Sequence, residues 1–212
     1  MSQINGSQGP YLEESQNKIY HLLFADDLSL ISTDELSIHP LNLLNKGIPD
    51  EAEMLQMAND PNVDSRYRLL FWKELFADGV DPVQMEVLGV VVEVGLETGL
   101  DVVAAYQDGS CRYLNHSGKT IFYDSPNEES LKFTTDLLNK GEAVARKIGP
   151  WYKPRKEFPT QGNIRLSFLC NNGLYFGEGS LEVMYQDEMA APIIDSALSL
   201  MNYMIDRVLA NN

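Results

Sequence analysis

The sequence predicts an α+β fold with a mainly antiparallel sheet of about six strands, in the order ββββ-α-ββ-α, and with flanking helices. Two observations indicate the sheet. One is the β-branched run over residues 85–96, and the other is a set of glycine-bearing turns between alternating apolar residues, at Asp108-Gly109, Ser117-Gly118 and Asn172-Gly173. A third observation indicates the helices, because apolar residues recur at three- and four-residue spacing before, between and after the strands.

Three parts are expected along the chain. Residues 1–17 are polar and contain glycine and proline, which predicts a flexible tail. Residues 18–82 predict a helical N-terminal section, in which Asp60-Pro61 ends one helix and Asp64 caps the next. Residues 83–212 predict the α+β domain.

The first hairpins set the expected positions of four polar side chains. If the Asp-Gly and Ser-Gly turns each have two loop residues, Arg112 pairs with Tyr123 and His116 with Lys119, all on one face of the sheet. Apolar residues alternate to both faces of these strands. We therefore expect the sheet to be covered on both sides in places.

The helix after the fourth strand has clear boundary signals in the sequence. Ser125 and Glu128 predict a capping box at its start, and Gly149-Pro150 predicts its end. The residues between these two signals suffice for an amphipathic helix.

A further hairpin and a helix complete the predicted domain. Around Asn172-Gly173, Cys170 is expected to face Tyr175, and the second strand is expected to run on through residues 174–185. The last helix is expected to begin near Asp187. Its wide apolar stripe consists of Ile194, Ala197, Leu198, Met201, Ile205 and Val208.

The charge of the chain bears on the partners it can take. The 212 residues carry a net charge of −15. Residues 1–64 hold 11 acidic residues and only Lys18 and Lys46, a net charge of −9, which leaves −6 for the remainder. Nucleic-acid phosphates need lysine and arginine, so this balance argues against a nucleic-acid partner and is compatible with a basic one.

The sequence gives no sign of a membrane partner or of secretion. No stretch approaches the roughly 18 apolar residues of a membrane helix, and the first residues lack the pattern of a signal peptide. Cys111 and Cys170 have no metal-type spacing, and the default is two buried, reduced thiols. We expect a cytoplasmic protein without a cofactor or a metal site.

Arg112, His116, Lys119 and Tyr123 form the first candidate site. In the predicted register they share one face, and such a set can bind an anion or act as general acid and base. The alternative is structural: Arg112 pairs with a local acid such as Glu93 or Asp101. No matched nucleophile and base accompany the set, so no catalytic residue is assigned.

The second candidate is the basic, aromatic segment around Trp151, Lys153, Arg155 and Lys156. It could bind an acidic partner or a phosphate-bearing ligand. The alternative, which we favour, is internal: the segment neutralises the acidic first third of the chain while Trp151 packs as an anchor.

The string FADD over residues 24–27 resembles the paired aspartates of reverse transcriptases, which hold catalytic magnesium. That mechanism needs a palm domain upstream and a third aspartate, and only 22 residues precede the string that begins at Leu23. We therefore interpret Asp26 and Asp27 as residues that cap or flank a short helix.

The strings YQDGSCRYLNHSGKTIFYD, KIGPW and GLYFGEG resemble a family of uncharacterised bacterial proteins, over residues 18–210. This resemblance implies a bacterial, cytoplasmic origin and brings no activity. Separately, the element order and acidity are similar to type III secretion chaperones, which are small dimeric binding proteins. The long N-terminal section and an extra strand depart from that pattern.

These observations lead to two functional hypotheses. The first is a non-enzymatic binding or adaptor protein, with a protein partner or a homodimer formed through the C-terminal helix or a sheet edge. The alternative is a small enzyme, a hydrolase or an anion-substrate enzyme, which uses the Arg/His/Lys/Tyr face of the sheet. The two differ in whether Arg112, His116, Lys119 and Tyr123 converge.

Overall fold

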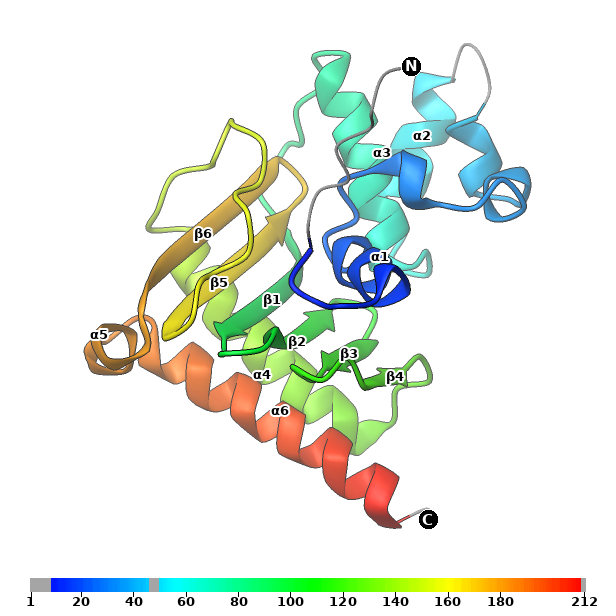
Figure 1. The fold of residues 1–212 in the computed structure, drawn as a ribbon. Helices are drawn as coiled ribbons and strands as arrows, with labels where there is room; N and C mark the ends of the chain where they lie inside the picture. Colours follow the sequence, from blue (N-terminus) through cyan, green and yellow to red (C-terminus); the bar gives the residue numbers. More distant parts are fainter. Residues whose placement is uncertain (1–8, 46–49, 211–212) are drawn as a thin grey trace, which may run out of the picture.

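A computed structural model describes residues 9–45 and 50–210 of the chain. Its centre is a six-stranded antiparallel sheet in the order β4-β3-β2-β1-β5-β6 (Figure 1). The strands are β1 (Val87–Gly95), β2 (Leu100–Tyr106), β3 (Cys111–Leu114), β4 (Thr120–Tyr123), β5 (Asn163–Cys170) and β6 (Gly173–Ser180). The predicted α+β class and the antiparallel six-stranded sheet are confirmed.

Helical elements cover both faces of the sheet (Figure 1). Before the strands come α1 (Glu14–Leu22), the 3₁₀ turns η1 (Leu28–Leu30), η2 (Glu35–Ser37) and η3 (Leu41–Leu43), α2 (Glu51–Asn59) and α3 (Ser65–Ala77). After β4 come α4 (Glu128–Ala145), α5 (Leu181–Gln186) and α6 (Ala191–Ala210). None of the described helices is long and apolar enough to cross a membrane.

Strand alternation divides the buried residues between two cores. In β1, Val91 points to the N-terminal section, while Val90 and Val92 point to α4 and α6. The first core joins the N-terminal section to the sheet through residues such as Tyr20 and Phe71, both fully buried. The expectation that the sheet is covered on both sides is confirmed.

The N-terminal section begins earlier than predicted. Residues 1–8 of the expected tail lie outside the described residues. The tail does not extend over residues 9–17, because Tyr11 is buried and its hydroxyl donates to the Leu100 carbonyl at 3.0 Å, and α1 begins at Glu14. Asp64 caps α3 as predicted, by accepting the backbone N–H of Arg66 at 2.8 Å.

The predicted register of the first hairpins is wrong by one residue. Arg112 pairs with Ala104 and Phe122, and Cys111 pairs with Tyr123. Each turn is a three-residue loop that ends in a left-handed glycine, with φ of 84° at Gly109 and 82° at Gly118. Side chains alternate along a strand, so the shift by one residue changes which of them share a face.

Three further boundaries differ from expectation. Helix α4 is capped by Asn127, whose capping box is completed by Ser130, and it ends at Ala145, before Gly149. In the second hairpin the loop is Asn171-Asn172, so Cys170 pairs with Gly173 instead of Tyr175.

The strand predicted over residues 174–185 ends at Ser180. There the Ser180 hydroxyl accepts the Val183 N–H at 3.4 Å and caps α5, a short helix that the alternating pattern did not indicate. Asp187 then accepts the Met189 and Ala190 N–H groups just before α6, and Pro192 lies in the first turn.

Candidate functional site

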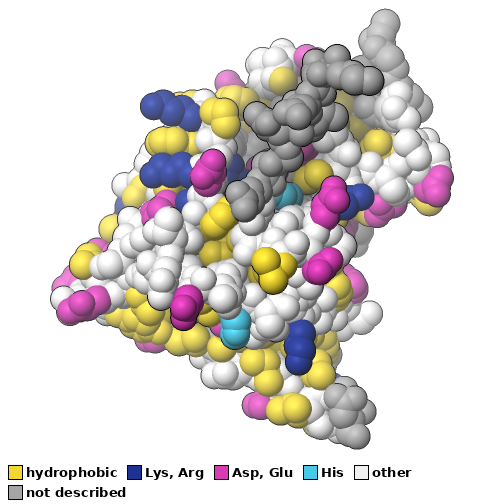
Figure 2. Space-filling view, viewed as in Figure 1, with side chains coloured by type: hydrophobic (Ala, Val, Ile, Leu, Met, Phe, Trp, Pro, Cys, Tyr) yellow, Lys and Arg dark blue, Asp and Glu magenta, His cyan; other side chains and the backbone are white. Residues whose placement is uncertain are grey.

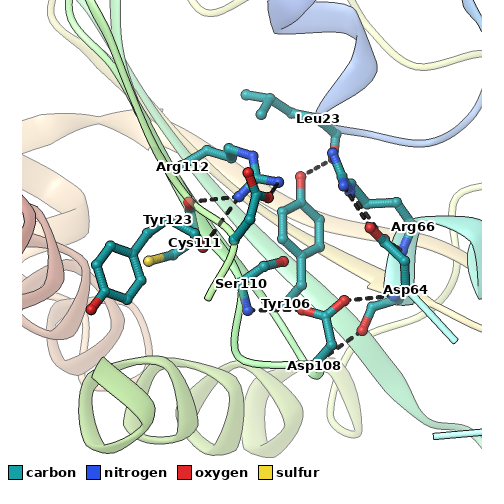
Figure 3. Close-up of polar contacts among 11 residues, drawn as sticks. Leu23, Asp64, Arg66, Tyr106, Asp108, Ser110, Cys111, Arg112 and Tyr123 are labelled. Atoms are coloured by element: carbon teal, nitrogen blue, oxygen red, sulfur yellow. Dashed lines mark hydrogen bonds and ion pairs between the residues drawn. The ribbon is translucent and has the colours of Figure 1, made fainter. Parts of the chain in front are cut away.

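Arg112 and Tyr123, the first pair of the predicted catalytic set, lie on opposite faces of the sheet. Figure 3 shows the Tyr123 ring pointing away from the Arg112 guanidinium. The ring of Tyr123 packs edge-on against Tyr203 of α6, at 6.2 Å between centroids. Arg112 is 2 % exposed on the side of the N-terminal section, where it forms an ion pair with Asp124 and lies over the Phe122 ring.

His116 and Lys119, the other pair, flank the loop between β3 and β4 and are exposed. His116 Nδ1 lies 3.2 Å from Asp101 Oδ1, and the same carboxylate accepts the His116 N–H at 2.7 Å. Arg112 thus pairs with a local acid, as the structural alternative expected, but that acid is Asp124 and neither Glu93 nor Asp101, which pairs with His116. The structure does not bring the four candidates together, and the enzyme hypothesis loses the geometry on which it rested.

The second predicted set, the basic segment, lies in the connection between α4 and β5. Trp151 packs edge-on against Phe176 at 5.2 Å, and its backbone N–H donates to the Leu174 carbonyl at 2.7 Å. The ammonium groups of Lys153 and Lys156 lie 5.4 and 5.7 Å from the centre of the Trp151 ring. Trp151 therefore anchors the connection on β6, and the two lysines stay at the surface.

Arg155 turns inward, toward the segment that follows α1. Its Nε donates to Asp26 Oδ2 at 2.9 Å, and its guanidinium stacks 3.7 Å from the centre of the Phe24 ring. Its Nη2 lies 3.1 Å from His21 Nδ1. Burial, with the Arg155 charge, lowers the pKa of His21, which leaves the neutral ring free to accept that hydrogen bond. At Arg155 the segment has the internal, charge-neutralising role that we favoured.

Asp26 and Asp27 differ in role. Asp26 faces Arg155, while Asp27 caps η1 by accepting the Ser29 backbone N–H at 2.9 Å. The interpretation of the pair as residues that flank a short helix is confirmed. Within the described residues, no group of three histidine, cysteine or carboxylate side chains could hold a metal ion.

A carboxylate fully buried beneath this region was not among the predicted site residues. Glu93 of β1 is 0 % exposed, and its Oε1 accepts the Tyr20 hydroxyl at 2.6 Å. Its Oε2 has no hydrogen-bond donor and lies 3.8 Å from Arg165 Nη1. Burial raises the pKa of Glu93, and the Arg165 charge opposes the rise. The hydrogen bond from Tyr20 to Glu93 thus holds α1 on the sheet.

Large apolar side chains are exposed on α5 and α6. Figure 2 shows hydrophobic side chains along the lower edge of this view, over these two helices. We define the α5–α6 strip by five residues that are 38 to 67 % exposed: Val183, Tyr185, Met189, Leu198 and Leu209. From the sequence, the C-terminal helix with its wide apolar stripe was one of two expected partner surfaces, whereas residues 181–185 of α5 were expected in a strand.

Comparison of the chain with protein-family models, curated proteins and solved structures finds no match. The class of protein is therefore defined by its own features. It is an antiparallel α+β protein with helical layers on both faces of the sheet and an exposed apolar strip on its last two helices. Its resemblance to uncharacterised bacterial proteins and to secretion chaperones stays a prediction.

Proposed function

We propose that the protein is a non-enzymatic binding or adaptor protein whose α5–α6 strip docks on a protein partner. The observation that carries this proposal is the exposure of five large apolar side chains on α5, on α6 and in the turn between them. Single exposed apolar residues are normal on a protein surface, but apolar side chains that gather along one edge, as Figure 2 shows here, typically mark an interaction site.

Helix α6 carries a wide apolar stripe, one side of which is buried in the protein while the other is exposed in part. The buried side faces α4 and the sheet with Ile193, Ala197, Leu200 and Met204. The outer side carries apolar residues at i, i+3, i+7 and i+11, of which the first and last are exposed and the others half-buried: Leu198, Met201, Ile205 and Leu209. This spacing suits packing against a helix of another chain.

Acidic residues border the strip and favour one type of partner. Asp195 and Asp206 lie beside it on α6, and Glu182, Asp187 and Glu188 lie on or after α5. No described lysine or arginine forms an ion pair with any of these five carboxylates. Arg207 is the only basic residue on the two helices, so two copies of α6 packed on each other would bring mainly like charges together. We therefore propose a partner that presents an apolar face bordered by lysine or arginine.

The experiment compares three affinity-tagged forms of the full chain produced in its native cells. They are the wild type, the double variant Leu198→Ser/Leu209→Ser, and the control Val83→Ser. Val83 is the matched control because it is fully exposed in the loop before β1, away from the strip. The three forms should unfold at similar temperatures, because all the substituted side chains are exposed.

The proposal expects one basic polypeptide to co-purify in stoichiometric amount with the wild type and with Val83→Ser. The double variant should bind it at least about tenfold more weakly, since the two most exposed apolar contacts of the α6 row are lost. High salt should also weaken the complex with the wild type. A polypeptide retained equally by all three forms would show that the strip is not the docking site.

A further inference from the structure

A small apolar cavity lies between α3, the turn after α1 and the β5–β6 hairpin. Its volume is about 180 Å³. Its walls are mostly aromatic and aliphatic and come from these three elements: Phe24, Leu69, Trp72, Phe76, Leu169 and Leu174. It lies apart from the α5–α6 strip, none of whose residues lines it.

The cavity walls are fixed in place by hydrogen bonds and by backbone conformation. The indole N–H of Trp72 donates to the Ala58 carbonyl at 3.1 Å, which orients the ring along the wall of the cavity. Ala25 has a φ of 47° and is the only described residue other than glycine in the left-handed region. This turn directs the Phe24 side chain to the core and Asp26 to the opening. The cavity is therefore formed before any ligand arrives.

Cationic groups gather at the opening. Lys73 of α3 donates to the backbone carbonyl of Asp26, and Arg155 pairs with the carboxylate of the same residue. An ammonium has three donors and a guanidinium has five, so both groups retain donors for a ligand. Asp26, Lys73, Arg155 and Leu174 also line a neighbouring groove, so the two spaces adjoin at these residues.

The adjoining groove continues the positive character of the opening. Lys153 and Lys156 line it, so that four cationic side chains face three carboxylates there, in a chain whose net charge is −15. A charged ligand is therefore better matched here by an anion than by a cation.

We propose that this cavity binds a small organic anion, with an apolar group the size of a benzene ring in the cavity and a carboxylate against Lys73 and Arg155. The volume suits such a group, because a cavity of about 150 Å³ lined by aliphatic and aromatic side chains accommodates benzene in another protein. The positive charges of Lys73 and Arg155 at the opening favour a carboxylate over a neutral group. The site is independent of the proposed partner-binding strip.

The test uses 3-phenylpropionate and two probes of the same shape, the neutral 3-phenylpropanamide and the cationic 3-phenylpropylamine. Binding to the full chain is detected by ligand-observed NMR and quantified by calorimetry. We expect the carboxylate to bind about tenfold more tightly than the amide, as one charge-assisted hydrogen bond allows, and the amine to bind least. Equal binding of acid and amide, or no binding of the acid, would overturn the proposal.

Three variants locate the binding. Leu174→Trp fills the cavity and should abolish binding of 3-phenylpropionate. Lys73→Met keeps the length of the side chain but removes its charge, and should reduce the preference for acid over amide, because Arg155 is then the only one of the two cations left to contact the carboxylate. Lys147→Met is the matched control, because Lys147 is exposed and lines neither space.

Lys73→Met keeps the test decisive even if Leu174→Trp does not fold, since the Lys73 ammonium is at the surface. Binding that is unchanged in Lys73→Met would place the anion elsewhere and overturn the assignment. Binding that is lost equally in Lys147→Met would show a non-specific charge effect, with the same consequence.

Discussion

Arg155 Nε lies 2.9 Å from Asp26 Oδ2, although the two residues are 129 positions apart in the chain. The pair joins the connection between α4 and β5 to the turn after α1. This ion pair thereby forms one side of the groove that adjoins the cavity. A contact between two irregular segments thus positions the proposed ligand site.

Asp26→Asn tests this pair. The substitution keeps the shape but removes the charge that faces Arg155, whose side chain is 14 % exposed. We expect a loss of about 0.5–1.5 kcal/mol in the free energy of unfolding, measured by urea titration. Asp34→Asn is the control, since Asp34 is exposed and its side chain caps no helix. Equal stability of the two variants would show that the pair contributes nothing.

We predict that the buried Glu93 carboxyl group makes the stability of the folded protein depend on pH. Its pKa is raised above the ordinary value of 4.5 in the folded chain because the carboxylate is buried. The folded state therefore binds the proton more tightly than the unfolded state. The resulting stabilisation is complete below about pH 4.5 and is lost as the pH rises through the folded-state pKa.

Glu93→Gln removes this titration and keeps an oxygen that accepts the Tyr20 hydroxyl. The variant should gain stability relative to the wild type as the pH rises from 4.5 to neutrality, by at most about 1.4 kcal/mol per pH unit. Urea titrations across this range give the measurement, with exposed Glu97→Gln as the control. A difference that does not change with pH would show that the Glu93 pKa is not raised.

The two cysteines should be unreactive in the folded protein. Both are buried and unpaired, as the sequence analysis expected. Burial raises the pKa of Cys111 to about 11 and that of Cys170 to about 12, so few thiolates are present near neutral pH. A disulfide-exchange reagent should label neither thiol until urea unfolds the chain, and then both. Rapid labelling of one thiol in the native protein would contradict this packing.

Gly141 tests how closely α4 approaches the sheet. A Cβ atom added there would lie 2.6 Å from Val90 Cγ2 and 3.1 Å from Phe168 Cδ1. Gly141→Ala should cost about 1–3 kcal/mol through overpacking, although alanine is the better helix former. Gly149→Ala is the control, because a Cβ at Gly149 meets open space. Unfolding free energies that rank the two variants in the opposite order would contradict the α4–β1 contact.

The fold was predictable because local signals agree with each other. The Asp64 cap, the glycine after α3 and the turns between strands each indicate one element, and their order indicates an antiparallel sheet with helices. Element types depend mainly on such short-range patterns. The short helix α5 was missed because residues 174–185 alternate like a strand, and only the Ser180 cap marks the change.

The candidate sites were harder to predict for two physical reasons. Asp-Gly fits both a two-residue turn and the left-handed end of a three-residue loop, and that one residue decided whether Arg112 faced Tyr123. The second reason is distance in sequence. No local pattern places Asp26 beside Arg155.

Native mass spectrometry of the protein, purified gently at low salt from its native cells, tests the proposed binding function most directly. We predict a mass equal to the chain plus one basic polypeptide. The same preparation of Leu198→Ser/Leu209→Ser should give the mass of the bare chain. A bare monomer from the wild type, or a homodimer that persists in the double variant, would contradict docking through the α5–α6 strip.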